Sequence, residues 1–221
     1  MDKRDFNFKK KYGQNFLKDH TIPKKIVSAS NILEDSLVIE IGPGAGALTK
    51  ELAKVAKQVI CYEIDESLEE ILDQELFNIS NVKVIYDDFL KRDIKSDLLK
   101  YSYHHLYVVA NLPYYITTPI ITRLVEDSID VEKVVVMIQK EVADRFCAKP
   151  GSREYGSITV FLNYFFDLKK EFLVNRNLFI PKPNVDSIVI SLTKKDNLLP
   201  LRNPELFFKL VRDSFHFKRK T

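Results

Sequence analysis

The segment Asn111-Leu112-Pro113-Tyr114 carries groups that can recognise an adenine. An Asn amide can hydrogen-bond the amino edge of the base, and a Tyr ring can stack on its face. Pro113 fixes one backbone angle and biases Leu112 toward an extended conformation. The apolar run before the segment indicates a buried strand, which places these residues at a carboxyl end, where open α/β sheets bind ligands. A strand-ending turn with a capping Asn would explain the same residues.

A second candidate site is the glycine-rich stretch after the first predicted strand. Gly42, Gly44 and Gly46 occupy alternate positions, where a missing β-carbon lets the backbone approach a ligand closely. With Ala47, the same stretch fits a dinucleotide fingerprint, so the glycines alone do not separate a nicotinamide cofactor from S-adenosylmethionine. A tight strand-to-helix turn without a ligand is the third interpretation.

Two acidic residues follow the next predicted strands. Glu63 ends one strand, where a carboxylate can take both ribose hydroxyls of a nucleoside cofactor. Asp88 follows the next strand and can accept from an adenine amino group. A dehydrogenase would also need a proton donor or acceptor beside its substrate, whereas methyl transfer chiefly needs an aligned nucleophile. None of the four histidines ends a predicted strand near the glycines; they are His20, His104, His105 and His216.

Elements of alternating type must position these residues. Strands are predicted at 37–41, 58–63, 82–86, 106–110 and 133–138, and helices near 46–56, 67–77, 118–127 and 139–147. This alternation indicates a parallel sheet with helices on both faces. Thr118 is predicted as an N-cap with Pro119 at the first helical position, and Ser67-x-x-Glu70 as a capping box.

The last third of the chain departs from this alternation. Residues 155–166 are apolar nearly throughout, so their periodicity does not separate a helix from a strand. Strands near 170–174 and at 186–193 are too close for a helical crossover, which predicts a hairpin and an antiparallel edge. Residues 194–202 are the expected linker, and Asn203-Pro204 opens one more helix.

Composition restricts the protein class. A chain of 221 residues with 45% hydrophobic content can bury one substantial core. Cys61 and Cys147 have no metal or redox spacing, which suits a reducing compartment. No secretory leader or apolar run long enough to cross a membrane is evident, so we expect a cytoplasmic protein without a membrane partner.

Charge is unevenly distributed along the chain. Residues 1–25 and 194–221 each hold eight basic against three acidic residues, whereas the stretch between them has 18 against 25. Basic ends on an acidic body would form a phosphate-binding surface if they meet in space. Two separate solubilising ends are the alternative.

Taken in order, these motifs resemble the rRNA adenine N6,N6-dimethyltransferases of the KsgA and Erm superfamily. The resemblance extends over nearly the whole chain. It rests on Gln14–Leu17, Glu40–Thr49, Glu63, Asp88-Phe89-Leu90, Asn111–Tyr114, Gln139-x-Glu141, Glu154–Ser157 and Phe179-x-Pro181-x-Pro183-x-Val185-Asp186-Ser187. The ordered set is far more specific than any one of its members.

The resemblance implies a fold and a cofactor. The fold is α/β, a Rossmann-like class I S-adenosylmethionine-dependent methyltransferase with a mostly parallel seven-stranded sheet and an antiparallel hairpin strand. Residues 1–195 would form the methyltransferase domain, with 1–25 closing over the cofactor. Residues 196–221 would be the first helix of a truncated C-terminal helical RNA-binding domain. The cofactor is S-adenosylmethionine, and no metal is expected.

Individual roles also follow from the resemblance. The residues expected to bind the cofactor are Gln14, Asn15, Leu17, Gly42, Gly44, Gly46, Glu63, Ile64, Asp88, Phe89 and Asn111. The residues expected at the target adenine are Asn111, Leu112, Pro113, Tyr114 and Phe179, with Tyr114 and Phe179 stacking on opposite faces of the base. The alternative for Phe179 is a core aromatic before the last hairpin. The Asp87-Asp88 doublet leaves two candidates for the cofactor acid, and alignment of the motif favours Asp88.

The resemblance also implies a partner. The expected partner is 16S rRNA of the small ribosomal subunit, and we expect the chain to be a monomer. The alternatives are a large-subunit rRNA methylase of the Erm type, which confers macrolide resistance, and a non-catalytic RNA-binding assembly factor. The dehydrogenase interpretation rests only on the glycine and alanine fingerprint.

Overall fold

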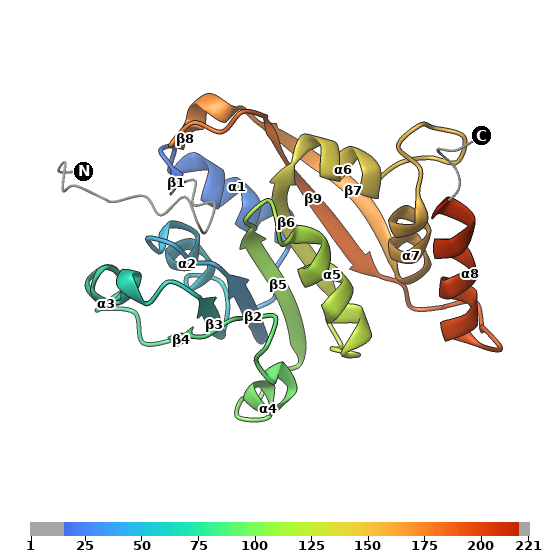
Figure 1. The fold of residues 1–221 in the computed structure, drawn as a ribbon. Coiled ribbons are helices and arrows are strands. Elements are labelled where there is room, and N and C mark those ends of the chain that lie inside the picture. The colour runs from blue at the N-terminus through green and yellow to red at the C-terminus, as the bar shows by residue number, and fades with distance from the viewer. Residues whose placement is uncertain (1–15, 217–221) are drawn as a thin grey trace.

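A seven-stranded sheet forms the centre of the molecule (Figure 1). The structure is a computed structural model and describes residues 16–216. Along the sheet the strand order is β4-β3-β2-β5-β6-β9-β7, and a separate small sheet pairs β1 with β8. The strands are β1 (Phe16–Leu17), β2 (Ser36–Ile41), β3 (Gln58–Glu63), β4 (Val82–Tyr86), β5 (His105–Asn111), β6 (Lys133–Gln139), β7 (Phe166–Val174), β8 (Phe179–Ile180) and β9 (Ser187–Lys194).

The five strands predicted between residues 37 and 138 are all confirmed, each within one residue of its expected bounds. β2 pairs in parallel with β3 and β5, and the pairs β3–β4 and β5–β6 are also parallel. β9 is antiparallel to both β6 and β7, which confirms the hairpin strand. The predicted antiparallel edge is also confirmed, because among the described strands β7 is the edge strand and pairs only with β9, which lies between β6 and β7.

Helices cover both faces of the sheet (Figure 1). The helices are α1 (Thr21–Ser30), α2 (Ala47–Leu52), α3 (Glu69–Leu76), α4 (Ile94–Leu98), α5 (Thr117–Glu126), α6 (Lys140–Phe146), α7 (Ser157–Phe165) and α8 (Pro204–His216), with short 3-10 turns η2 (Glu66–Leu68) and η3 (Arg176–Leu178). In β5, Val108 and Ala110 join one core with residues of α4–α7, while Tyr107 and Val109 join the other with α1 and α2. Because β5 is buried on both faces, its sequence is apolar almost without interruption.

Two predicted helix starts are wrong. α5 begins at Thr117, with Ile116 in the capping position, so Thr118 is not its N-cap. The turn after Tyr114 leads directly into the helix, since the Ile116 amide donates to the Pro113 carbonyl at 3.2 Å. The capping box at Ser67 is also absent. Asp65 caps this turn instead and accepts from the Ser67 amide at 3.2 Å and from its hydroxyl at 2.6 Å.

Other elements differ in extent from the prediction. α1 and α4 had no predicted counterpart, and α2 ends four residues before the expected 46–56 segment does. The apolar stretch 155–166 is helical as α7, and β7 begins at Phe166 rather than near 170. Among the described residues, no helix is long and apolar enough to cross a membrane.

The last helix packs against α7 through aromatic rings. Phe208 is nearly buried, and its ring centroid lies 5.0 Å from that of Phe161 and 5.6 Å from that of Tyr164. The Tyr164 hydroxyl also donates to the Leu199 carbonyl at 2.5 Å. The expected linker is thus hydrogen-bonded to α7. A domain boundary at residue 195 remains a prediction.

Candidate active site

A cavity of about 630 Å³ opens at the carboxyl edge of the parallel strands. Its walls come from the residues that follow β2, β3, β4 and β5. β3 and β4 extend the sheet on one side of β2, whereas β5 and β6 extend it on the other. Open α/β sheets bind ligands at such a switch point, and this volume is typical of a ligand pocket.

The glycine loop forms the wall between β2 and α2. Gly42 and Gly44 line the cavity with φ angles of 70° and 60°, which glycine adopts readily. A Cβ on Gly44 would lie 3.1 Å from the Phe16 ring. Gly46 was expected to bind the cofactor but does not line the cavity, because it faces Leu72 and Leu76 of α3. Its positive φ shapes the turn into α2.

Glu63 holds this loop and remains a candidate for ribose binding. Its carboxylate accepts from the amide of Gly44 at 3.2 Å and from that of Asp65 at 2.9 Å, one amide to each oxygen. The side chain is 4% exposed, and burial raises its pKa, although both amide bonds oppose that shift. A carboxylate offers about four acceptor positions, so each oxygen can accept one further hydrogen bond from the cavity.

Glu40 lies beneath the loop, and no cation among residues 16–216 forms an ion pair with it. The Glu40 side chain is buried. The carboxylate accepts from the Thr49 hydroxyl at 2.6 Å and contacts the Cys61 thiol at 3.5 Å. Burial raises the pKa of Glu40 from 4.5 to about 7, while the bonds to Thr49 and Cys61 oppose the shift. Its side chain therefore changes charge near neutral pH.

This pKa predicts a pH-dependent stability. Between pH 4.5 and 7 the unfolded chain loses the Glu40 proton first, so the free energy of unfolding falls by about 3 kcal/mol and stays lower above pH 7. Glu40→Gln should remove this decline and be more stable than wild type at pH 8. Urea unfolding of cofactor-free protein from pH 5 to 8.5 measures the effect, with the exposed Glu70→Gln as control. Parallel pH profiles for Glu40→Gln and wild type would contradict the prediction.

The loop after β4 forms the next wall. Asp87 and Asp88 both line the cavity. Asp88 accepts from the Leu90 amide at 2.9 Å, while Asp87 pairs with Arg92 at 3.2 Å. Asp88 also has a cationic neighbour, the Lys91 ammonium at 3.5 Å, so both acids are partly neutralised within the protein. The choice of Asp88 as the cofactor acid remains a prediction.

A polar cluster fixes that loop against α5. Arg92 donates two hydrogen bonds to Asp97, at 2.8 and 2.9 Å, and these hold the pKa of the Asp97 carboxyl well below its usual range. Arg123 of α5 donates to the carbonyls of Phe89 and Arg92, the latter at 2.6 Å. Its guanidinium also lies 5.7 Å from the centre of the Phe89 ring. Arg123 therefore connects the β4 loop to the helix that follows Tyr114.

The segment Asn111–Tyr114 forms the opposite wall of the cavity. Asn111 is the last residue of β5 and aligns with Met137 of β6. The Leu112 amide donates to the Met137 carbonyl at 3.2 Å, which fixes the backbone immediately after Asn111. Pro113 lies beside Gly42, since a Cβ on that glycine would be 4.0 Å from the proline Cδ. The segment expected to bind the base and the glycine loop are thus neighbours in the cavity wall.

Phe179 is not placed as the resemblance suggested. Its side chain is 1% exposed and belongs to the core shared with α1 and α2, so it does not line the cavity. Its neighbour Ile180 lines the cavity instead. β8 carries both residues and pairs with β1, where Phe16 aligns with Ile180 and Leu17 with Phe179. Stacking of Phe179 on a base would require this side chain to leave the core.

The structure therefore brings most of the predicted residues together. Those that line one cavity are Leu17, Gly42, Gly44, Glu63, Ile64, Asp88, Phe89, Asn111, Leu112, Pro113 and Tyr114. Gly46 and Phe179 do not, and Gln14 and Asn15 lie outside the described residues. Residues that had no predicted role include the wall residues Phe16, His20 and Ile180 and the supporting Arg123. No local pattern marks Arg123, because its partners lie about thirty positions away in the sequence.

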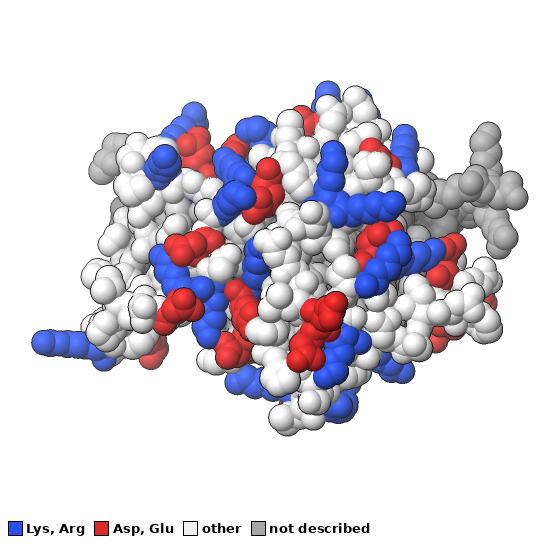
Figure 2. Space-filling view, turned by 180° about the vertical axis from the view of Figure 1, so that it is seen from behind, with Lys and Arg blue, Asp and Glu red and all other residues white. Residues whose placement is uncertain are grey.

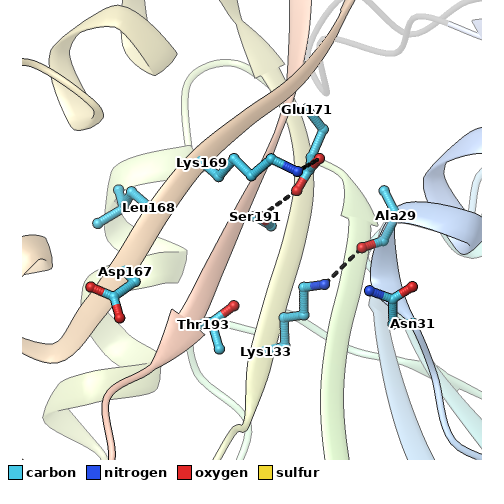
Figure 3. A pocket seen from close by; sticks show the side chains of 9 residues that line it. All are labelled: Ala29, Asn31, Lys133, Asp167, Leu168, Lys169, Glu171, Ser191 and Thr193. Carbon is cyan, nitrogen blue, oxygen red and sulfur yellow. Dashed lines mark hydrogen bonds and ion pairs between the residues drawn. The ribbon is translucent and has the colours of Figure 1, made fainter.

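A second, open cavity of about 470 Å³ lies over β6, β9 and β7 (Figure 3). It lies toward Lys133, the first residue of β6, and hence away from the carboxyl end of that strand. Its charged groups already have partners within the protein. Lys133 donates to the Ala29 carbonyl at 2.7 Å, and Glu171 accepts from Lys169 and Ser191, each at 2.7 Å. These contacts stabilise the sheet and the end of α1 and do not indicate a ligand.

Basic and acidic side chains are mixed on the face shown in Figure 2. Several lysines of the basic stretch 194–221 form ion pairs with acidic side chains. Lys194 pairs with Asp130, Lys195 lies 3.6 Å from Asp167, and Lys209 lies 2.6 Å from Asp213. Most of the basic residues before position 25 lie outside the described residues, so a joint surface of the two ends remains a prediction. Among residues 16–216, no group of His, Cys, Asp and Glu is arranged to hold a metal ion.

Comparison with known proteins agrees with this geometry. The chain is 45% identical to ribosomal RNA small subunit methyltransferase A of Enterococcus faecalis over 224 residues, which cover 100% of this chain and 76% of that protein. A dimethyladenosine transferase structure from Plasmodium falciparum is 32% identical with a TM-score of 0.81, covering 93% of this chain and 72% of that one. The 23S rRNA methyltransferase ErmE is 30% identical with a TM-score of 0.78, covering 91% and 79%.

The family model of ribosomal RNA adenine dimethylases matches residues 5–221. The match includes the glycine loop, the acids after β3 and β4, and the Asn111–Tyr114 segment. The chain belongs to the ribosomal RNA adenine dimethylase family.

Proposed function

We propose that this protein transfers methyl groups from S-adenosylmethionine to N6 of two adjacent adenines in a hairpin loop near the 3′ end of 16S rRNA. The observation that carries the proposal is one cavity shared by two kinds of group. Glu63 and Asp88 suit a nucleoside cofactor on one side of β2, and Asn111 and Tyr114 suit a target adenine on the other. The product would be N6,N6-dimethyladenosine.

The walls of the cavity fit the cofactor chemically. The glycine loop leaves room that a Cβ would reduce, and Glu63 has acceptor positions turned to the same space. Ile64, which is 44% exposed, and the half-buried Leu17 offer apolar surface for an adenine ring. When bound, S-adenosylmethionine supplies a methyl group on a positively charged sulfur. Methyl transfer from this sulfur requires no metal ion in the protein.

The remaining chemistry belongs to the protein side chains. A target adenine must leave its stack to enter the cavity, and the Tyr114 ring offsets part of the lost stacking, roughly 1–3 kcal/mol per base. Asn111 and the Leu112 carbonyl accept from the exocyclic amine, which favours a pyramidal nitrogen whose lone pair points along the line of attack. The methylated nitrogen then loses its proton to water. Each transfer breaks the sulfur–methyl bond and leaves S-adenosylhomocysteine, so the second transfer requires a second molecule of the cofactor. The monomethyl amine keeps one N–H and therefore donates to only one of the two acceptors.

The degree of similarity favours small-subunit RNA as the substrate. Identity is 45% to the small-subunit enzyme of E. faecalis and 30% to ErmE, which acts on 23S rRNA. A large-subunit substrate is therefore the second candidate. A role as a non-catalytic assembly factor is disfavoured because Asn111, Tyr114 and Glu63 remain together around one cavity.

The test is methylation of purified 30S particles with isotopically labelled S-adenosylmethionine, with 50S particles in parallel. Mass spectrometry of the nucleosides should find labelled N6,N6-dimethyladenosine in 16S rRNA, at two neighbouring positions. Label confined to 23S rRNA would overturn the choice of substrate. Failure to bind S-adenosylhomocysteine in calorimetry would favour the assembly factor, whereas NADH binding in its place would favour a dehydrogenase.

A further inference from the structure

We propose that Ser187 is a positioning residue for methyl transfer, because its hydroxyl holds the Tyr114 ring in the orientation that presents a face to the target base. The two hydroxyl oxygens lie 3.0 Å apart. This inference rests on the proposed function, since it concerns the same site. Ser187 itself touches neither base nor cofactor in this scheme and acts through Tyr114.

Ser187 is held firmly on three sides. It is the first residue of β9, is fully buried, and aligns with Gln139 of β6 and Val174 of β7. Just before it, the Asp186 carbonyl accepts from the Lys140 amide at 3.0 Å. A serine side chain has only one rotatable bond to its oxygen, so this backbone fixes the hydroxyl closely.

Tyr114 has fewer restraints than its partner. It lies in the turn between β5 and α5, is half-buried, and lines the cavity. The backbone anchors one end of the side chain, and the Ser187 hydroxyl anchors the other end, 73 positions away in the sequence. Fixing the phenol oxygen sets the first side-chain torsion of the tyrosine. The oxygen lies on the axis of the second torsion, but a phenol hydroxyl is conjugated with its ring and makes its hydrogen bonds close to the ring plane. The direction to Ser187 therefore restricts the plane of the ring as well. Base stacking depends on that plane.

The phenol remains protonated at neutral pH. Burial raises the pKa of Tyr114, and the nearby Asp186 carboxylate acts in the same direction, although the bond to Ser187 opposes them. A neutral phenol can donate to Ser187 or accept from it. The contact therefore persists over the pH range in which the enzyme would be assayed.

The kinetic test compares Ser187→Ala, Tyr114→Phe and the double variant on 30S particles. We expect Ser187→Ala to lower kcat about tenfold, the effect of one neutral hydrogen bond, with an unchanged Kd for S-adenosylhomocysteine. If Ser187 acts through the phenol, it should have no further effect in the Tyr114→Phe background. Multiplicative losses in the double variant, or wild-type kcat for Ser187→Ala, would overturn the proposal.

A matched control removes general packing effects. Ser191→Ala deletes another hydroxyl from the same strand, one that is 3% exposed and donates to Glu171 at 2.7 Å in the second cavity. We expect this variant to keep wild-type kcat. Urea unfolding of both variants shows whether they lose similar stability. An equal loss of kcat in Ser191→Ala would mean that Ser187 acts only through stability.

A substrate-free measurement separates this proposal from the proposed function. The chain has ten tyrosines, and ring-¹³C-labelled protein with the Tyr114→Phe variant identifies the Tyr114 signal. Ser187→Ala should shift or broaden that signal, whereas Ser191→Ala should leave it in place. If wild type transfers no methyl group to 30S particles, the proposed function fails, and this measurement alone decides the role of Ser187. An unmoved Tyr114 signal in Ser187→Ala would refute it.

Discussion

Asn111→Ala should abolish nearly all turnover while leaving both ligands bound. We expect kcat on 30S particles to fall roughly 10³-fold, at the upper end of what removal of one group that stabilises a transition state costs. The Kd values for S-adenosylhomocysteine and for the RNA should change less than threefold. The reason is that an acceptor on the exocyclic amine matters most when the nitrogen becomes pyramidal, which occurs only during reaction.

The structure makes this variant a clean test. Asn111 ends β5, which is flanked by β2 and β6, and the Leu112 amide is fixed by the Met137 carbonyl. Truncation of the side chain therefore leaves the backbone of the site in place. Asn111→Asp retains an acceptor and should recover part of the rate.

Single-turnover kinetics at saturating cofactor measures the chemical step directly. Asn163→Ala is a suitable control, because this exposed asparagine lies on α7 and donates to the Thr159 carbonyl. It should show wild-type turnover. A loss of less than tenfold in Asn111→Ala, or a loss explained by weaker cofactor binding, would refute the role assigned to Asn111.

The sequence predicted the central sheet because its signals are local. β2, β3, β5 and β6 are largely apolar runs buried on both faces, and such runs remain recognisable without knowledge of their neighbours. Strand ends then place Glu63 and Asn111 at one edge, since parallel strands end on the same side. The candidate site was thus largely predictable from the alternation of strands and helices.

Phe179 shows where this reasoning stops. β8 has two residues, and neighbouring side chains on a strand point to opposite faces. Its pairing with β1 buries Phe179 and leaves Ile180 at the cavity, and a shift of one residue would reverse that arrangement. A motif fixes which residues are present but does not fix such a register.

Helix starts were missed for a related reason. Thr118-Pro119 and Ser67-x-x-Glu70 satisfy local capping rules, yet the preceding turns supply other partners. Both the amide and the hydroxyl of Ser67 donate to the Asp65 carboxylate, so Asp65 and not Ser67 caps the turn. The contact of Arg123 with the Phe89 carbonyl is likewise created only by packing of α5 beside the β4 loop.

Glu63→Gln should weaken binding of S-adenosylhomocysteine by about 100-fold or more. The carboxylate already accepts from the Gly44 and Asp65 amides, so its remaining acceptor positions are those available to two ribose hydroxyls. A Gln side chain keeps one acceptor oxygen, but its NH2 group carries two donors and cannot accept from a backbone amide or a ribose hydroxyl. Hydrogen bonds to a charged group contribute about 1.5–3 kcal/mol each, so loss of one or two of them gives this effect.

Calorimetry on folded protein measures the change, with Glu66→Gln as the matched control. Glu66 is exposed on η2, three positions further along, and the same substitution there should leave the Kd unchanged. The ribose contact itself is tested with the 2′-deoxy analogue of S-adenosylhomocysteine. Wild type should bind this analogue about tenfold more weakly than the parent compound, whereas Glu63→Gln should distinguish the two much less. Equal discrimination by both proteins would mean that Glu63 only supports the Gly44 loop, because a carboxylate that never contacts the ribose cannot sense the missing hydroxyl.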